Sequence, residues 1–174
     1  MSALVVYESC FGNTALVARS VGDGIATHMP VRVCSVTCLD DHGTDGEDLV
    51  VIGGPTHAFA MSRPQTRRDA MERLGDRPVD QAGIREFIDR LAPARSMQLY
   101  ATFDTRADNV RHLPGSAAHS AARALRHNGH RVVDRGASFY VAGVEGPLLP
   151  YERDRAREWG ERVALRAEEL LQRA

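Results

Sequence analysis

The residues with the most specific chemical character lie near the N-terminus, in residues 8–14, which read Glu-Ser-Cys-Phe-Gly-Asn-Thr. This stretch joins an apolar run to a segment with helical periodicity. Several backbone N–H groups and the positive end of a helix dipole then point at one place, which suits a phosphate dianion. Ser9 and Thr14 add hydroxyl donors, and Gly12 permits close approach of the backbone. The stretch therefore predicts a phosphate site. An ordinary strand-to-helix turn, with Asn13 or Thr14 as its N-cap, is the alternative.

Other ligand-binding signatures are absent from the sequence. The 22 basic residues are all arginine, so no lysine follows this stretch as it would in a Walker-type loop, and there is no Gly-x-Gly-x-x-Gly fingerprint. Cys34 and Cys38 are not spaced as a Cys-x-x-Cys pair. The histidines between residues 112 and 130 have no cysteine or carboxylate partners at ligand spacing. We therefore expect no metal site.

Strand-like apolar runs alternate with helix-like periodic segments along the chain. The expected strands cover residues 3–7, 31–36, 49–52, 97–103 and 131–142, the last interrupted at Gly136. The expected helices cover residues 14–28, 81–91, the segment from the N-cap Ser116 to Asn128-Gly129, and 151–171. Residues 60–80 read as irregular. This alternation predicts an α/β protein with a parallel sheet, right-handed crossovers and helices on both faces.

This fold class indicates where a ligand would bind. In open parallel sheets, ligands bind outside the carboxyl ends of the strands, where the strand order reverses. The loops after the first, third and fourth expected strands are therefore the candidate binding loops.

Residues 7–14 resemble the phosphate loop of flavodoxins, whose pattern is Ser/Thr-x-Thr-Gly-Asn-Thr. The matching residues are Ser9, Gly12, Asn13 and Thr14. Phe11 stands where a hydroxyl residue is usual, and Cys10 fills the free position. The resemblance implies bound FMN and a flavodoxin-like, doubly wound three-layer α/β sandwich. It also implies a five-stranded parallel sheet in the order 2-1-3-4-5 and a single domain over residues 1–174.

The loop after the third strand, residues 53–61, resembles the second flavin-contacting loop of flavodoxin-like proteins. Its Gly-x-Pro-Thr start is closer to the quinone-reductase branch than to small acidic flavodoxins. The resemblance implies that backbone groups near residues 56–59 meet the edge of the isoalloxazine ring. His57 or Phe59 would cover one ring face. The alternative is that Phe59 belongs to the core and His57 is an exposed loop residue.

The loop after the fourth strand, residues 102–106, corresponds by the same resemblance to the segment that binds the pyrimidine edge of the flavin. Residues 107–112 contain no aromatic side chain, so one ring face is expected to stay open unless Arg106 or Arg111 stacks on it. The residues predicted to bind FMN are Ser9, Cys10, Phe11, Gly12, Asn13, Thr14, Pro55, Thr56, His57, Ala58, Phe59, Thr102, Phe103, Asp104, Thr105 and Arg106.

The resemblance favours a one-electron carrier that cycles between a flavoprotein reductase and an acceptor protein, with no catalytic side chain. The first alternative is an FMN-dependent NAD(P)H:quinone oxidoreductase, in which Arg63, Arg67 and Arg68 would form a basic rim for a nicotinamide phosphate. These arginines could equally be solvated. The second alternative is a non-flavin regulatory module of the same fold. A phosphoacceptor receiver would need a lysine after a late strand, and the chain has none.

Length and composition set the remaining limits. A net charge of −1 among 174 residues argues against a protein that binds nucleic acid through phosphate contacts. No apolar run approaches the ~20 residues of a membrane-spanning helix, so we expect no membrane association. Three cysteines in a chain with no visible secretory signal favour the cytoplasm. We expect a monomer or a weak dimer.

Overall fold

A central parallel sheet organises the chain. The computed structural model describes residues 1–39, 43–74, 82–93 and 97–173. The sheet strands are β1 (Ala3–Tyr7), β2 (Val31–Ser35), β3 (Leu49–His57), β5 (Leu99–Ala107), β6 (Arg131–Val132) and β7 (Ala137–Val141). β1 pairs in parallel with β2 and β3, β3 pairs with β5, and β5 pairs with both β6 and β7. Because β6 and β7 are the two parts of the interrupted fifth strand, the predicted order 2-1-3-4-5 is confirmed.

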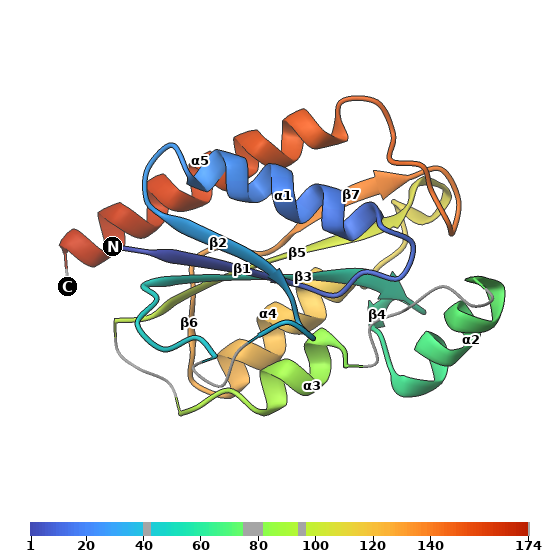
Figure 1. Ribbon diagram of the computed structural model, residues 1–174, viewed down its shortest axis with the longest axis horizontal. Helices are drawn as coiled ribbons and strands as arrows, with labels where there is room; N and C mark the ends of the chain where they lie inside the picture. Colours follow the sequence, from blue (N-terminus) through green and yellow to red (C-terminus); the bar gives the residue numbers. More distant parts are fainter. Residues whose placement is uncertain (40–42, 75–81, 94–96, 174) are drawn as a thin grey trace.

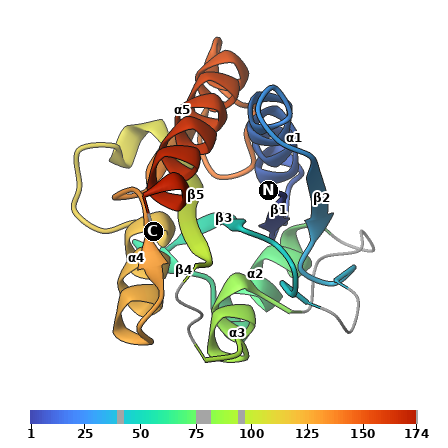
Figure 2. The same ribbon diagram turned by 90° about the vertical axis from the view of Figure 1, so that its left-hand side faces the viewer.

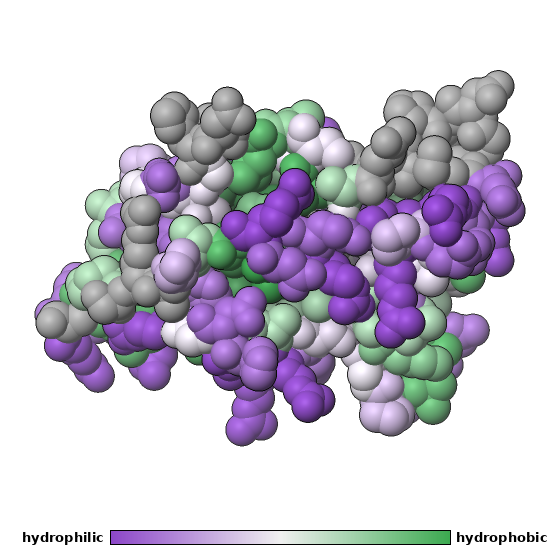
Figure 3. Space-filling model, turned by 90° about the horizontal axis from the view of Figure 1, so that it is seen from below, coloured by the Kyte–Doolittle hydropathy of each residue, from purple (hydrophilic) through white to green (hydrophobic). Residues whose placement is uncertain are grey.

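Helices cover both faces of this sheet (Figures 1 and 2). α1 (Asn13–Ile25) and α5 (Glu152–Gln172) lie together on one face, and α3 (Ile84–Asp89) and α4 (Ala117–His127) lie on the other. On the α3/α4 face, which Figure 3 shows, hydrophilic side chains predominate. This is expected for helices that turn their apolar side toward a sheet. The three-layer arrangement predicted from the sequence is therefore present.

The two faces of the sheet form two separate apolar clusters. On the α1/α5 face, Val5 and Val51 pack with the Phe103–Phe139–Trp159 group, whose rings meet edge to face about 6 Å apart. On the α3/α4 face, the alternate strand residues Leu4, Val50 and Ile52 pack with Ile84 of α3 and Leu125 of α4. Each fully buried side chain of this size contributes about 1.5–3 kcal/mol, so the clusters fix the sheet register and the strand ends.

A helix was missed in the segment read as irregular. α2 (Pro64–Leu74) follows the short strand β4 (Ala60–Met61), which pairs antiparallel with β3. Pro64 suits a first helical position because it needs no N–H acceptor there. The segment is strongly polar, and its buried positions include Arg67 and Ala70, so it lacks the apolar stripe by which amphipathic helices are found. Residues 75–80 of the same segment lie outside the described residues.

Two strands are longer than the sequence predicts. β3 continues past residue 52 to His57, and β5 continues past residue 103 to Ala107. The extension of β5 arises because β7 pairs with residues 103–107 and supplies hydrogen bonds along the strand. The sequence of β5 alone cannot predict this pairing. Residues 104–106 therefore belong to a strand, and the expectation of a loop there was wrong. The helix expected over residues 81–91 is shorter, at Ile84–Asp89, and residue 81 lies outside the described part.

The contact between α1 and α5 requires glycine. A Cβ at Gly24 would overlap the carbonyl oxygen of Arg157 on α5, and a Cβ at Gly160 would overlap the carbonyl oxygen of Val21 on α1. The two helix backbones therefore approach each other closely, and each uses a glycine at the contact.

We expect Gly24→Ala to destabilise the protein. Alanine in a helix interior ordinarily gains up to ~1 kcal/mol over glycine, so a loss would show that the α1–α5 contact outweighs helix propensity. Overpacking of this kind costs about 1–3 kcal/mol, measurable as a fall in the free energy of unfolding in urea. Leu165→Ala, on the exposed side of α5, is the control and should change stability by less than ~0.5 kcal/mol. A gain in stability for Gly24→Ala would contradict the close approach.

Candidate functional site

A cavity of about 440 Å³ lies at the carboxyl ends of the strands. Its walls come from the loop after β1, the ends of β3, β5 and β7, and one side of α2. Its volume falls within the ~300–1,000 Å³ typical of small-molecule sites, and its position is the one where parallel sheets bind ligands. The lining residues are Cys10, Phe11, Asn13, Thr14, Pro55, Thr56, His57, Ala58, Phe59, Thr66, Asp69, Ala70, Arg73, Thr105, Arg106, Ala107, Asn109, Val110, Val141, Gly143 and Val144.

Most of the predicted site residues from all three loops meet in this cavity. The predicted residues that do not line it are Ser9, Gly12, Thr102, Phe103 and Asp104. The cavity also includes residues that the sequence did not single out, on α2, on the segment 107–110 and on the segment 141–144. The α2 residues had no signal in the sequence, because the helix itself was not recognised there.

The first loop leads directly into α1. Gly12 is the N-cap residue, with φ of 88°, and it offers no side chain to cap the helix. Ser9 Oγ accepts the N–H groups of Gly12 (3.2 Å) and Ala15 (3.3 Å) and so stabilises the turn from within. Among the described residues, the N–H groups of Asn13 and Thr14 have no acceptor. The alternative with Asn13 or Thr14 as N-cap was wrong, and the helix start is open to an external anion.

Two side chains of this helix start connect it to the other walls. The hydroxyl of Thr14 lies 2.7 Å from that of Thr105 at the end of β5, and both side chains are buried. The side-chain amide of Asn13 donates to the carbonyl of Glu145, 2.8 Å away, in the segment between β7 and α5. The first loop, the β5 end and the segment after β7 are thereby held together around the cavity.

The start of α4, in contrast, is capped by side chains of the fold itself. The N–H of Ala117 donates to Thr56 Oγ1 (2.8 Å), that of Ala118 to Asp104 Oδ2 (2.8 Å), and that of His119 to Ser116 Oγ (3.3 Å). Ser116 is the N-cap, as the sequence predicted. Burial raises the pKa of Asp104 above its ordinary value.

Three residues predicted at the pyrimidine edge of a flavin thus serve the scaffold. Asp104 caps α4, the hydroxyl of Thr102 donates to the carbonyl of Ala118 (3.0 Å), and the ring of Phe103 packs in the core. The structure places all three outside the cavity because β5 runs on to Ala107. Only Thr105 and Arg106 of that predicted group line it.

The loop after β3 is a tight β-hairpin. His57 pairs with Ala60, so the turn consists of Ala58 and Phe59, with φ of 46° and 63°. Two-residue turns with positive φ favour Asn-Gly, and a larger side chain there costs on the order of 1–3 kcal/mol per residue. The turn places Phe59 at the cavity with 45% of its surface exposed. Burial lowers the pKa of the neighbouring His57, which favours its neutral form.

The wall formed after β5 is held by Arg106. Its guanidinium donates to the carbonyls of Val110 and Leu113, which folds the short helix η1 (Asp108–Val110) against the end of the strand. Arg111, the other arginine considered for stacking on a ring, lies over Tyr140 instead, 5.6 Å from the ring centre. Val144, 62% exposed, lines the cavity beyond β7. No aromatic side chain lines the cavity from residues 105–110 or 141–144.

Comparison with solved structures gives the same architecture at low sequence identity. A flavodoxin from the domain Archaea is 19% identical, covers 97% of this chain and 99% of its own, and has a TM-score of 0.66. A Streptococcus pneumoniae flavodoxin is 16% identical, with 95% and 99% coverage and a TM-score of 0.64. A WrbA-like protein from Agrobacterium tumefaciens is 16% identical, with 97% and 98% coverage and a TM-score of 0.59. This chain has the flavodoxin-like fold. No protein-family model and no curated protein matches the sequence.

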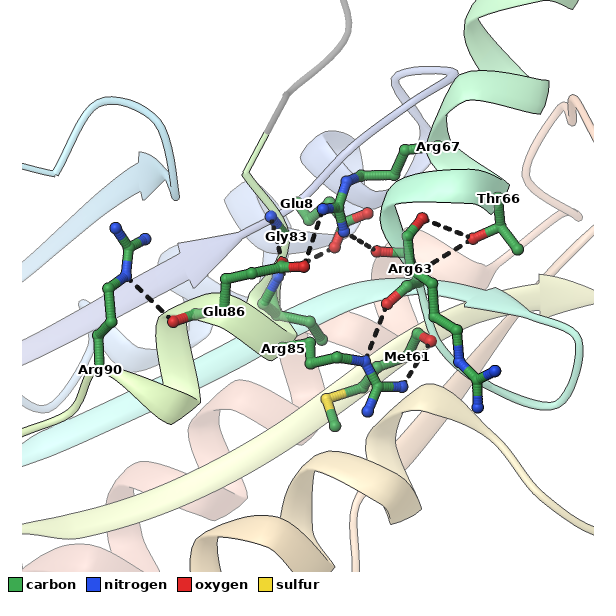
Figure 4. Close-up of polar contacts among 11 residues, drawn as sticks. Glu8, Met61, Arg63, Thr66, Arg67, Gly83, Arg85, Glu86 and Arg90 are labelled. Carbon is green, nitrogen blue, oxygen red and sulfur yellow. Dashed lines mark hydrogen bonds and ion pairs between the residues drawn. The ribbon is translucent and has the colours of Figure 1, made fainter.

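In this flavodoxin-like chain, α2 is held against the first loop by a buried charged cluster (Figure 4). Arg67, only 3% exposed, donates to Ser62 Oγ (2.8 Å) and to Glu86 on α3 (2.9 Å). Glu86 in turn accepts the N–H of Gly83 (3.0 Å), and the buried Glu8 accepts the N–H of Ile84 (3.0 Å). The cluster joins Glu8, the first residue of the stretch 8–14, to both α2 and α3.

The interpretation of Arg67 as part of a basic rim was therefore wrong, because its charge is used inside the protein. Arg63 and Arg68 are exposed, as the solvated alternative expects. Arg73, which the sequence analysis did not select, is the arginine of α2 that lines the cavity. Neither Glu8 nor Glu86 had a recognisable signal, since their partners lie far away in the sequence.

Two further classes of site are not supported by the described residues. No group of three or more histidine, cysteine, aspartate or glutamate side chains in the described ranges could hold a metal ion. None of the helices in those ranges combines the length and the apolar character needed to cross a bilayer.

We expect Glu8→Gln to change how stability depends on pH. Burial raises the pKa of Glu8 above its ordinary value of 4.5, outweighing the lowering effects of Ser62, the Ile84 N–H and Arg67. Above pH 4.5 the folded protein retains this proton longer than the unfolded chain does, so the Glu8 contribution to stability falls as pH rises toward the folded-state pKa. Glutamine has no such penalty. The wild type should lose stability relative to Glu8→Gln as the pH rises above 4.5 in urea titrations.

The control for this comparison is Glu72→Gln, which removes an exposed carboxylate from α2. Its stability should follow the wild-type pH dependence. Parallel curves for the wild type and Glu8→Gln would mean that Glu8 titrates alike in the folded and unfolded states.

Proposed function

We propose that this flavodoxin-like protein binds FMN in the cavity and acts in electron transfer. The observation that carries the proposal is the contrast between two helix starts at the same edge of the sheet. α4 has its first three N–H groups capped by side chains, whereas at the start of α1 Ser9 Oγ accepts the N–H of Ala15 and those of Asn13 and Thr14 have no acceptor among the described residues. A helix start with two open N–H groups next to a cavity of ligand size suits a phosphate.

The remaining lining fits the rest of FMN. Phe59 and His57 on one side, and Val110 and Val144 on another, give flat or apolar surfaces suited to a tricyclic ring. The Thr14 hydroxyl can accept from Thr105 and still donate to a phosphate oxygen. When bound, FMN supplies one- and two-electron redox chemistry, and the chain's part is to hold it, orient it and set its electrostatic environment.

Within this role we favour an electron carrier between a flavoprotein reductase and an acceptor protein. Exposed apolar side chains at the cavity, Phe59 and Val144, offer a surface for transient contact with protein partners. The neighbouring structures named as flavodoxins support the same reading by analogy of fold.

An NAD(P)H:quinone oxidoreductase is the second candidate, and one observation favours it. The wall formed by residues 105–110 and 141–144 has no aromatic side chain to cover a ring face, which leaves room for a nicotinamide or quinone to stack. Arg73 at the same cavity could then meet an anionic group of the donor. If this candidate holds, Arg73→Met should raise KM for NADPH more than for NADH.

We expect Thr14→Ala and Asn13→Ala to weaken FMN binding by roughly ten- to hundredfold, as a lost charge-assisted hydrogen bond costs about 1.5–3 kcal/mol. Wild-type protein should bind riboflavin, which lacks the phosphate, much more weakly than FMN. The variants should reduce this difference, because both residues lie at the start of α1, where the phosphate would bind. Fluorescence titration measures each affinity.

The matched control is Thr27→Ala, at the opposite end of α1, where the hydroxyl donates to Gly24. It should leave both affinities unchanged. Equal wild-type affinity for FMN and riboflavin would show that the start of α1 binds no phosphate. Failure to bind either flavin would favour the non-flavin regulatory module.

Direct reduction by nicotinamides decides between carrier and enzyme. For a carrier, we expect excess NADH or NADPH to leave the flavin band unbleached under anaerobic conditions, while a catalytic amount of a flavoprotein reductase reduces it rapidly. Nicotinamide must stack on the ring to deliver hydride, so a covered face blocks it. Stopped-flow absorbance checks this. Rapid bleaching by NAD(P)H alone, followed by turnover with a quinone, would establish the enzyme instead.

A further inference from the structure

Arg106 is a buried cation at the cavity without an anionic partner. Its side chain lines the cavity although the residue is only 6% exposed. The guanidinium donates to two backbone carbonyls, and its buried Nε has no partner in the part of the chain that the structure describes. It forms no ion pair with any described carboxylate.

Arg67 shows what a structural arginine looks like in the same protein. It is equally buried and its Nε likewise has no partner among the described residues, but its guanidinium is paired with the carboxylate of Glu86 at 2.9 Å and with Ser62. A buried charge without a counter-charge costs several kcal/mol, whereas carbonyl oxygens offset this only in part. Among the described residues, the charge of Arg106 is thus left without an ion pair beside the cavity.

The nearby carboxylate of Asp104 attracts Arg106 but offsets its charge only in part. Asp104 is the acidic residue closest in sequence on β5, and its carboxylate is committed to the N–H of Ala118 at the start of α4. Burial also raises the pKa of Asp104, so less of its charge is available to Arg106. A ligand is therefore the natural source of the missing negative charge.

The position of Arg106 indicates which end of the ligand it meets. Successive side chains of a strand point to opposite faces. Thr105 points to the face of α1, where its hydroxyl meets Thr14 beside the uncapped helix start. Arg106 therefore leaves the sheet on the other face, away from the candidate phosphate end. Its charge is available to the ring end of a ligand whose phosphate lies at α1.

We infer that Arg106 favours the negative charge that the ring of FMN gains on reduction, an inference that rests on the proposed FMN binding. Two electrons from a reduced flavoprotein or dithionite, with one proton from water, leave the ring with one added negative charge. Sulfite places the same charge there by forming a sulfur–nitrogen bond with the oxidised ring, with no leaving group. A buried guanidinium near the ring makes both equilibria more favourable.

The test compares Arg106→Met, which removes the charge, with Arg106→Lys, which keeps it. Arg68→Met is the matched control, since it removes an exposed cation of α2 that bonds to Gln65 and does not line the cavity. Three quantities are measured for each: the affinities for FMN and riboflavin, the two-electron midpoint potential against redox dyes, and the dissociation constant for sulfite.

We expect Arg106→Met to shift the reduction equilibrium at least tenfold toward oxidised FMN, about 30 mV for a two-electron couple, and to weaken sulfite binding at least tenfold. Arg106→Lys should keep most of the wild-type potential and sulfite affinity, because it keeps the charge. Arg68→Met should match the wild type. Unchanged potential and sulfite affinity in Arg106→Met would overturn the inference. So would a loss of affinity for FMN alone, which would make Arg106 a phosphate ligand.

Loss of affinity for both FMN and riboflavin in Arg106→Met and Arg106→Lys alike would also overturn the inference. Arg106 would then only position the segment 107–113. The proposed function fails separately and earlier, if the wild-type protein binds no FMN. The inference about Arg106 then falls with it.

Discussion

The carboxyl edge of the sheet depends on how backbone N–H groups are satisfied where helices begin beside a buried core. A buried N–H without an acceptor costs about 1–3 kcal/mol, so each helix start needs an internal cap, water or an external ligand. The start of α4 takes caps from β3, from β5 and from its own N-cap, which joins two strand ends to that helix. The start of α1 has Gly12 instead, and its first residues line the cavity. One fold thus contains a closed helix start and an open one at the same edge of the sheet, on opposite faces.

The same contrast separates the two buried arginines. Arg67 and its carboxylate partner Glu86 fix α2, which the apolar contact of Ala70 with Cys10 also holds against the first loop. Arg106 has carbonyl partners alone. A paired buried charge positions a wall, while an unpaired one at a cavity raises the affinity for negative charge. The scaffold therefore uses both the charge and the hydrogen bonds of Arg67, whereas Arg106 holds the wall after β5 through hydrogen bonds and keeps a charge with no ion pair among the described residues.

Most of the fold could be predicted from the sequence because each central strand is apolar throughout, as strands covered on both faces must be. The cap at Ser116 and the interruption at Gly136 were local signals, and both are confirmed. The misses have a common physical cause. α2 has no apolar stripe, the continuation of β5 depends on pairing with β7, and the partners Glu8, Arg67 and Glu86 are brought together by the fold alone. The FMN-binding roles of the site residues stay predictions.

The β3–β4 turn shows why a sequence pattern cannot place a side chain at a site. Asn-Gly would relieve the positive φ of both turn residues, yet Ala58 and Phe59 occupy them. The flanking residues keep the turn in place: Thr56 is bonded to the start of α4, and Met61 is buried in the core. Gly115 leaves room for the carbonyl of Phe59. A Cβ on residue 115 would lie only 2.8 Å from that oxygen. Strain is thus tolerated because its neighbours are fixed, and the result is an aromatic ring held at the cavity before any ligand arrives, which lowers the ordering cost of binding.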